Sequence, residues 1–255
     1  MNVVLFEKKE VIGSRITFAD RRAEHLVKVL RAEIGDKVRV GIIDGNMGTG
    51  MVLGIKKKYP FSVDLHIEFA EPPPGSPSID LILALPRPIM LKRILSQATA
   101  LGVGAIHLIN ANRVEKSFWE AGILQPEEYR FHLLQGLEQA VDTRVPGIHI
   151  HRRFKPFIED YFPTLQSNYR YRLLADPGGK RELGEVVNSG QGRVALAVGP
   201  EGGWVDYEID KFEKQHFWGC TIGERILKVD TAVIALHSRT SALLEISEKD
   251  HMSTA

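Results

Sequence analysis

The spacing of hydrophobic residues differs between the first 70 residues and the rest of the chain. Residues 1–70 hold short β-branched runs, partly alternating with polar positions and separated by turn residues, at 3–6, 37–44, 48–59 and 61–69. This pattern predicts a small β-rich domain. One segment departs from it: apolar residues recur at helical spacing after Asp20, at Ala23, Leu26, Val27 and Leu30. A single helix is therefore predicted from a cap at Asp20 to Gly35.

The segment after residue 70 reads EPPPGSPS and marks a boundary. Consecutive prolines join neither a helix nor a central strand, so a stiff linker is predicted over residues 71–79. Residues 80–247 are expected to form a second domain. Residues 248–255 are expected to be a polar tail, with no apolar face to pack against the rest of the protein.

The second domain alternates strand-like runs with amphipathic stretches. Apolar runs occur at 81–86, 105–110, 170–176, 194–199 and 217–223, and helical patterns occur at 88–102, 126–141 and 231–246. This alternation is typical of β-α units around a mainly parallel sheet. The predicted fold class is therefore α/β.

Charge and cysteine content narrow the function classes. The formal net charge of the 255 residues is +1, which argues against binding a polyanion by bulk charge. Residues 1–70 carry net +3, so a local phosphate-contacting face is predicted on the small domain, with a solvated helix and a lysine-guarded edge strand as the alternative. Cys220 is the only cysteine, which favours a reducing cytoplasm. No apolar run reaches the length of a membrane span, so a soluble protein is expected.

Three segments of the second domain place glycine or proline directly after a buried strand. They are LLADPGG, VALAVGPEGGW and FWGCTIGERILKVDTA. Ligands bind at strand ends in open α/β sheets, so these loops predict a small-molecule cleft. The dinucleotide and phosphate-loop motifs do not occur in the sequence, which removes the main support for those functions.

The combination of GPEGG at 199–203, Glu208-Ile209 and GERILKVDTA at 223–232 resembles the C-terminal signature of one methyltransferase family. HLVKVLR, QATALGV and EQAVDTRVP extend the similarity over nearly the whole chain. The sequence is identified as similar to ribosomal RNA small subunit methyltransferase E, a 16S ribosomal RNA uridine-N3 methyltransferase of the SPOUT class. It departs from the family pattern at Ala100, at Lys228 and Asp230, and in the motif DTRVP.

The resemblance implies a PUA-like β-barrel over residues 1–70 for RNA and a SPOUT-type α/β domain with a deep trefoil knot over 80–247. It also implies S-adenosylmethionine as cofactor, ribosomal RNA or the small ribosomal subunit as partner, and a homodimer, without metal or membrane. The departures leave a second function open, a non-catalytic RNA-binding or assembly factor on the same fold.

The resemblance and the predicted strand ends together give candidate site residues. The candidates for catalysis are Arg144, Arg225 and Glu201, with a salt bridge or phosphate contact as the alternative for the arginines and a cap on the following helix for Glu201. Asp230 and Thr231 are expected to cap the last helix. The candidates for RNA binding are Arg21, Arg22, Lys28 and Arg31. The candidates for cofactor binding are Leu174, Ala175, Asp176, Val198, Gly199, Pro200, Glu201, Gly202, Gly203, Thr221, Ile222, Gly223, Arg225, Ile226 and Leu227.

Two further features have structural interpretations. His149 and His151 alternate on a predicted strand at a spacing that could hold a metal, but no third ligand is evident. Cys220 lies among apolar residues and is expected to be a small core residue rather than a nucleophile.

Overall fold

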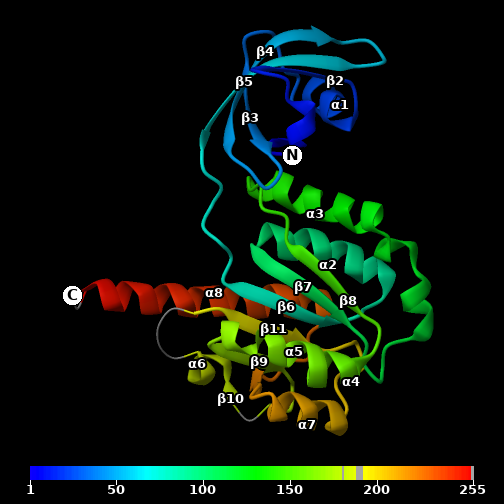
Figure 1. Ribbon diagram of the computed structural model, residues 1–255, viewed down its shortest axis with the longest axis vertical. Coiled ribbons are helices and arrows are strands. Elements are labelled where there is room, and N and C mark those ends of the chain that lie inside the picture. The colour runs from blue at the N-terminus through cyan, green and yellow to red at the C-terminus, as the bar shows by residue number, and fades with distance from the viewer. Residues whose placement is uncertain (180, 188–191, 254–255) are drawn as a thin grey trace. The chain divides into compact units, whose positions relative to one another are not determined.

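The computed structural model describes residues 1–179, 181–187 and 192–253, and these divide into two compact units (Figure 1). The first unit holds Met1–Gly75 and Leu133–Val145, and the second holds Ser76–His132 and Pro146–Ala255. The division near residue 75 falls within the predicted linker. The inclusion of Leu133–Val145 in the first unit was not predicted.

The sheet of the first unit has five strands in the order β1-β3-β4-β5-β2. They are β1 (Val4–Phe6), β2 (Arg15–Phe18), β3 (Lys37–Ile42), β4 (Met47–Lys56) and β5 (Ser62–Glu71), with the short helix η1 (Lys8–Glu10) after β1. β1 pairs parallel to β3 and the other pairs are antiparallel. The strands share one core that includes Phe6, Phe18 and Leu65. β2 was not predicted, because its four residues include only two buried apolar side chains.

Helix α1 (Arg21–Lys28) is the predicted helix of this unit, but it is shorter than expected. Asp20 caps its start by accepting a hydrogen bond from the backbone N–H of Arg22. The prediction that it continues to Gly35 was wrong. Arg31 adopts a left-handed φ of 52°, and the backbone N–H of Ala32 turns back to the carbonyl of Leu26, which ends the helical path.

The C-terminal half of α3 (Pro126–Ala140) belongs to the first unit because its residues complete that unit's packing. Leu137 forms a small buried cluster with Val3 and Leu5. The backbone N–H of Asn2 donates to the carbonyl of Glu138 at 2.7 Å. The expected boundary between residues 1–70 and 80–247 therefore describes the chain only in part.

The second unit is built on a seven-stranded sheet in the order β10-β12-β9-β11-β6-β7-β8, and every pair in it is parallel. The strands are β6 (Ile79–Ala84), β7 (Val103–Ile109), β8 (Gly147–His151), β9 (Tyr171–Ala175), β10 (Arg181–Glu182), β11 (Val194–Val198) and β12 (Trp218–Thr221). The five apolar runs predicted as strands correspond to β6, β7, β9, β11 and β12. The two-residue strand β10 was missed because it is too short to show a pattern.

Helices cover this sheet. α2 (Pro88–Ala100) and α8 (Val229–Ser253) pack against each other, while α6 (Leu183–Val186) and α7 (Asp206–Lys214) follow β10 and the β11 loop. The connection after β8 holds α4 (Phe154–Pro156), η4 (Phe157–Tyr161), α5 (Phe162–Leu165) and η5 (Gln166–Asn168), and η2 (Lys116–Glu120) and η3 (Gly122–Leu124) precede α3. The predicted end of the last helix at residue 246 was wrong, since α8 continues to Ser253. Polar residues without Gly or Pro do not end a helix.

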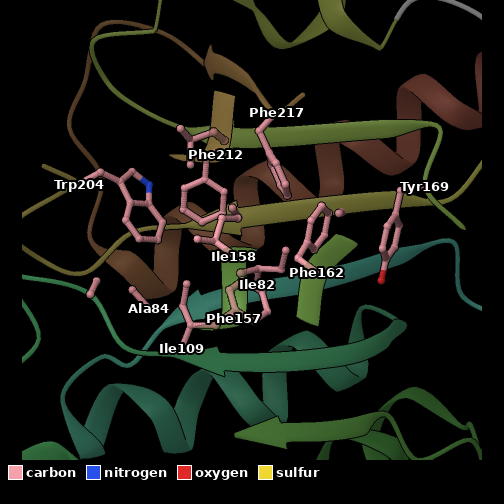
Figure 2. Close-up of a cluster of buried hydrophobic side chains, with 14 residues drawn as sticks. Ile82, Ala84, Ile109, Phe157, Ile158, Phe162, Tyr169, Trp204, Phe212 and Phe217 are labelled. Carbon is pink, nitrogen blue, oxygen red and sulfur yellow. The ribbon is translucent and has the colours of Figure 1, made fainter. Parts of the chain in front are cut away.

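Aromatic side chains fill the layer between the sheet and the connection after β8. Figure 2 shows Phe162 from this connection beside Phe217, which packs on Phe212 of α7, and Phe157 packs on Phe162. Ile82 of β6 faces this layer. Because side chains alternate along a strand, Leu81 and Leu83 face the opposite side of the sheet. Because the sheet is buried on both faces, successive residues of its strands are apolar, and each strand appears in the sequence as a continuous apolar run.

Candidate active site

One cleft of about 700 Å³ lies at the carboxyl ends of β9, β11 and β12. It lies wholly within the second unit. Its walls are four chain segments, Ala175–Pro177, Val198–Gly203, Cys220–Gly223 and Arg225–Val229, with Arg87, Met90, Ala232 and Leu236 from the flanking helices. The volume lies within the range of pockets that hold small molecules or cofactors.

The cleft brings together the three glycine-rich segments singled out in the sequence. Every residue named there as a cofactor-binding candidate lines the cleft except Leu174. Leu174 is fully buried in β9 and belongs to the aromatic core instead. Side-chain alternation explains the difference, since Ala175 points the other way.

The loop from Gly199 to Gly203 owes its shape to two of its glycines. Gly203 has a φ of +74°, a conformation that side chains disfavour, and its N–H donates to the carbonyl of Pro200 at 2.8 Å. A Cβ on Gly199 would lie 3.1 Å from the indole of Trp204, so the ring packs directly on the backbone. The result is a cleft wall made of peptide groups rather than side chains.

Glu201 lies at the start of α2. Its Oε1 accepts a hydrogen bond from the backbone N–H of Arg87 at 3.2 Å, where a carboxylate also complements the positive end of the helix dipole. The alternative that Glu201 caps the following helix is not what the structure shows. Glu208 serves that helix, α7, by accepting from the backbone N–H of Val205 at 3.0 Å.

Arg225 and Arg144, the two arginines proposed for catalysis, lie in different units. Arg225 lines the cleft and is exposed to solvent. Arg144 lies in the first unit, where its backbone N–H donates to Asp142 at 3.0 Å. The structure therefore brings Arg225 to the cleft and keeps Arg144 in the other compact unit.

Two of the residues that depart from the family pattern, Lys228 and Asp230, lie at the beginning of α8. Lys228 lines the cleft and Asp230 occupies the first turn, where Thr231 donates its backbone N–H to the Asp230 carboxylate at 3.0 Å. Asp230 is therefore inside the helix rather than at its cap position. It also faces Arg93 of α2, with 4.0 Å between the charged atoms.

Cys220 borders the cleft but is a core residue, as predicted. Its side chain is 1% exposed, and burial raises the pKa of the thiol to about 12, with Asp176 adding to the shift. The thiolate form is therefore rare at neutral pH, which does not suit a nucleophile.

The basic residues of α1 divide into two groups. Arg22 is enclosed: it bonds the carboxylates of Asp20 and Glu10 and the carbonyl of Leu5, and its guanidinium lies 4.8 Å from the Phe6 ring centre. The carboxylates raise the pKa of Arg22, although burial opposes them as the largest single effect. Its side chain is only 11% exposed.

The other three basic residues of α1 and its end are more accessible. Arg21 forms a two-point ion pair with the buried Glu138, at 2.6 and 3.0 Å. Lys28 is exposed and forms an ion pair at 2.6 Å with Glu24, which is also exposed, and Arg31 is exposed after the helix. The structure therefore leaves Lys28 and Arg31 best placed to meet a phosphate.

The histidines of β8 meet a third histidine that the sequence did not reveal. His107 of β7 stacks on His149 with 4.7 Å between ring centres, and its Nδ1 lies 3.4 Å from Nε2 of His151. The rings stack rather than converge. Across the described ranges, no group of three or more His, Cys, Asp or Glu side chains is arranged to hold a metal.

Several site residues lie outside the motifs and were missed. Arg87 and Met90 enter the cleft from the beginning of α2, and Arg113 reaches the loop at Gly202 from the segment after β7. A proline at the helix start, Pro88, was the one signal that placed Arg87 near a strand end. In the described part of the chain, no helix is long and apolar enough to cross a membrane.

Comparisons with known proteins agree with this architecture. The family model described as RNA methyltransferase domain matches residues 74–241, and the model described as RNA methyltransferase PUA domain matches residues 18–64. Ribosomal RNA small subunit methyltransferase E of Treponema pallidum is 30% identical over 92% of this chain and 88% of its own length. The corresponding protein 1 of Borreliella burgdorferi is 26% identical over 96% of this chain and 99% of its length.

Solved structures show the same fold. The Neisseria gonorrhoeae enzyme of this name, bound to S-adenosylmethionine, is 19% identical with a TM-score of 0.75 and covers 96% of this chain and 98% of its own. A Legionella pneumophila protein with bound S-adenosylmethionine is 20% identical, also with a TM-score of 0.75, and covers 94% and 97%.

The all-parallel sheet, the cleft at its carboxyl edge and the attached PUA domain define an α/β RNA methyltransferase with a PUA domain. Within that class, the chain belongs to the ribosomal RNA small subunit methyltransferase E family.

Proposed function

We propose that this protein transfers a methyl group from S-adenosylmethionine to N3 of a uridine in 16S ribosomal RNA. The observation that carries the proposal is the single cleft into which the three glycine-rich segments converge. The family to which the chain belongs supports the reaction class, and the motif resemblance supports the uridine and its N3 atom.

The cleft fits S-adenosylmethionine in size and in chemistry. Its volume of about 700 Å³ accommodates a nucleoside with an amino-acid arm. Peptide groups of Val198–Gly203 and Cys220–Gly223 offer donors and acceptors to an adenine edge, while Ile226, Leu227 and Leu236 offer apolar contact. When bound, the cofactor supplies an electrophilic methyl group on a sulfonium.

The protein's part is to place the acceptor and to stabilise the charge that develops on it. N3 lies on the pairing edge of uracil, so the base must be unpaired or turned out of its stack. Loss of the N3 proton spreads negative charge onto the two neighbouring carbonyl oxygens, and a cation aimed at them lowers the barrier. Arg225, exposed on the cleft wall, is our first candidate for that role, and Arg144 is the second.

Glu201 is less suited to proton transfer than to holding the loop. Its carboxylate accepts from the start of α2, which ties the Gly199–Gly203 loop to that helix. We therefore propose that Glu201 organises the cleft. The exposed Lys28 and Arg31 of the first unit are proposed to hold RNA phosphates.

We also propose that the active form is a cytoplasmic homodimer, as the resemblance implies. Ile226 lines the cleft with 82% of its surface exposed, and Ile89, next to the cleft residue Met90, is 64% exposed. Apolar side chains this exposed are consistent with a second copy covering the mouth of the cleft. Light scattering is expected to give twice the 28.6 kDa mass of one chain.

Methyl transfer to small ribosomal subunits tests the proposal. The protein is incubated with labelled S-adenosylmethionine and subunits that lack the modification, and the RNA is digested for mass spectrometry of its nucleosides. We expect N3-methyluridine, and an Arg225→Ala variant that, at saturating cofactor, transfers the methyl group at least about tenfold more slowly. Cofactor binding without transfer to any RNA would favour the non-catalytic RNA-binding function instead.

A further inference from the structure

The loop Gly199–Gly203 is fastened by a segment that the motifs do not include, the turn after β7. The carboxylate of Glu208 accepts from the backbone N–H of Asn112 at 2.6 Å and from that of Val205 at 3.0 Å. Glu208 is 2% exposed. Both of its oxygens are thus used to join the turn after β7 to the end of the loop.

Arg113 reaches further along the same loop. Its Nη1 donates a hydrogen bond to the carbonyl oxygen of Gly202, and its aliphatic stem runs along that glycine. A Cβ on Gly202 would lie 2.8 Å from Cδ of Arg113. The Arg113 side chain therefore occupies space that a side chain at position 202 would need.

One peptide group of the cleft wall is held at both ends. The carbonyl of the Gly202–Gly203 peptide accepts from Arg113, and its N–H, which belongs to Gly203, donates to Pro200. Glycine backbones have wide conformational freedom, so without these bonds the peptide could rotate. Hydrogen bonds at both ends of this peptide group hold it in one orientation in the cleft wall.

We propose that Arg113 is a positioning residue for S-adenosylmethionine, which acts by holding the Gly202 carbonyl and so keeps the loop in its binding conformation. This inference rests on the cleft being the cofactor site. When only a fraction of the protein molecules is in the conformation that binds a ligand, the apparent affinity for that ligand is reduced by that fraction. Arg113 therefore raises the affinity for the cofactor through the loop.

The test compares Arg113→Met with Arg113→Lys. Methionine keeps the apolar stem but has no donor, whereas lysine keeps a charged donor that can reach one carbonyl. By calorimetry with S-adenosylmethionine, we expect Arg113→Met to raise the Kd about tenfold and Arg113→Lys to raise it by about threefold or less, since tenfold corresponds to about 1.4 kcal/mol.

Arg152→Ala is the matched control. Arg152 also donates from Nη1 to a backbone carbonyl, that of Trp119 at 3.2 Å, but it does not line the cleft. Its loss should leave the Kd within about twofold of the unmodified protein. If Arg113→Met does not fold, Arg113→Leu, which also has no donor, takes its place with the same expected direction.

Hydrogen exchange of the cofactor-free protein gives a readout independent of binding. The Gly203 amide should exchange faster in Arg113→Met than in the unmodified protein or in Arg152→Ala. Equal Kd values and equal exchange in Arg113→Met and the unmodified protein would overturn the proposal. So would an Arg113→Lys protein as impaired as Arg113→Met, because the contact requires only a donor.

These outcomes are separate from those of the proposed reaction. Failure of the unmodified protein to methylate uridine would refute the proposed substrate and leave the binding comparison standing. Failure to bind the cofactor at all would overturn both the cleft assignment and the role of Arg113.

Discussion

At the scale of single residues, burial is the largest influence on the charge of His107. Desolvation lowers the pKa of His107 to about 3, and the neighbouring His149 and His151 act in the same direction. Tyr161 and Phe157 pack against its ring from η4. The histidine is therefore neutral in the folded protein at every physiological pH.

This neutrality predicts a loss of stability in mild acid. The unfolded chain binds a proton on this histidine below its ordinary pKa of 6.5, but the folded chain does not until about pH 3. The stabilising contribution is thus complete above pH 6.5 and is lost as the pH falls below it, by up to about 1.4 kcal/mol per pH unit.

Urea unfolding between pH 5 and 7.5 measures this effect. The unfolding free energy should fall with decreasing pH, and His107→Phe should make the fall less steep. A His107→Phe protein with the same dependence on pH as the unmodified protein would show that His107 is not the group responsible.

Site residues were predictable where a motif marks a strand end. Gly199–Gly203, Thr221–Gly223 and Arg225–Leu227 line one cleft, because carboxyl ends of parallel strands meet at one edge, and their binding of the cofactor stays a prediction. Arg87 and Arg113 were not predictable. Arg87 acts through its backbone N–H, which any residue could supply. Arg113 lies on a segment without a motif, and the sequence does not reveal which carbonyl oxygen its side chain contacts.

At the scale of elements, α1 separates structural from exposed cations. Arg22 links the helix to Glu10 and lies over Phe6, whereas Lys28 and Arg31 face solvent. The sequence presents all three as one basic group. The contacts of Arg22 with Asp20, Glu10, Leu5 and Phe6 distinguish it.

Substitutions along α1 should therefore have opposite consequences. Arg22→Ala should lower the unfolding free energy by about 2 kcal/mol or more, because it leaves carboxylates without their partner, and should leave the salt dependence of RNA binding unchanged. Lys28→Ala and Arg31→Ala should leave stability unchanged, and each should reduce the slope of log affinity against log salt by about 1.

Chemical unfolding and filter binding at several salt concentrations check these effects. Lys9→Ala, at an exposed lysine of η1, is the control for removal of one positive charge. If Arg22→Ala reduced the salt slope while Lys28→Ala and Arg31→Ala did not, the proposed RNA-contacting face of the first unit would be wrong.

Element type was predictable where an element is long or is buried on both sides. The strands β6, β7, β9, β11 and β12 and the helices α2 and α3 follow from apolar spacing alone. The ends were less predictable. A left-handed residue at Arg31 ended α1 early, and a polar sequence without Gly or Pro let α8 continue to Ser253.

At the scale of the whole molecule, contacts distant in sequence decide the division into units. Leu133–Val145 lies far along the chain from residues 1–75, yet Asp44 donates its backbone N–H to the carbonyl of Thr143 at 2.7 Å. Hydrophobic spacing describes local structure and carries no information about such pairs. The α/β class followed from pattern, whereas the knot followed only from resemblance.

The central claim is that the loops after β9, β11 and β12 form the binding site for S-adenosylmethionine. The most direct measurement is a crystal structure of the protein with S-adenosylhomocysteine, the demethylated product, which occupies the site without reacting. We predict its adenosyl group among Ala175–Pro177, Val198–Gly203 and Cys220–Val229. Density for the nucleoside elsewhere on the protein, with this cleft filled only by solvent, would contradict the account.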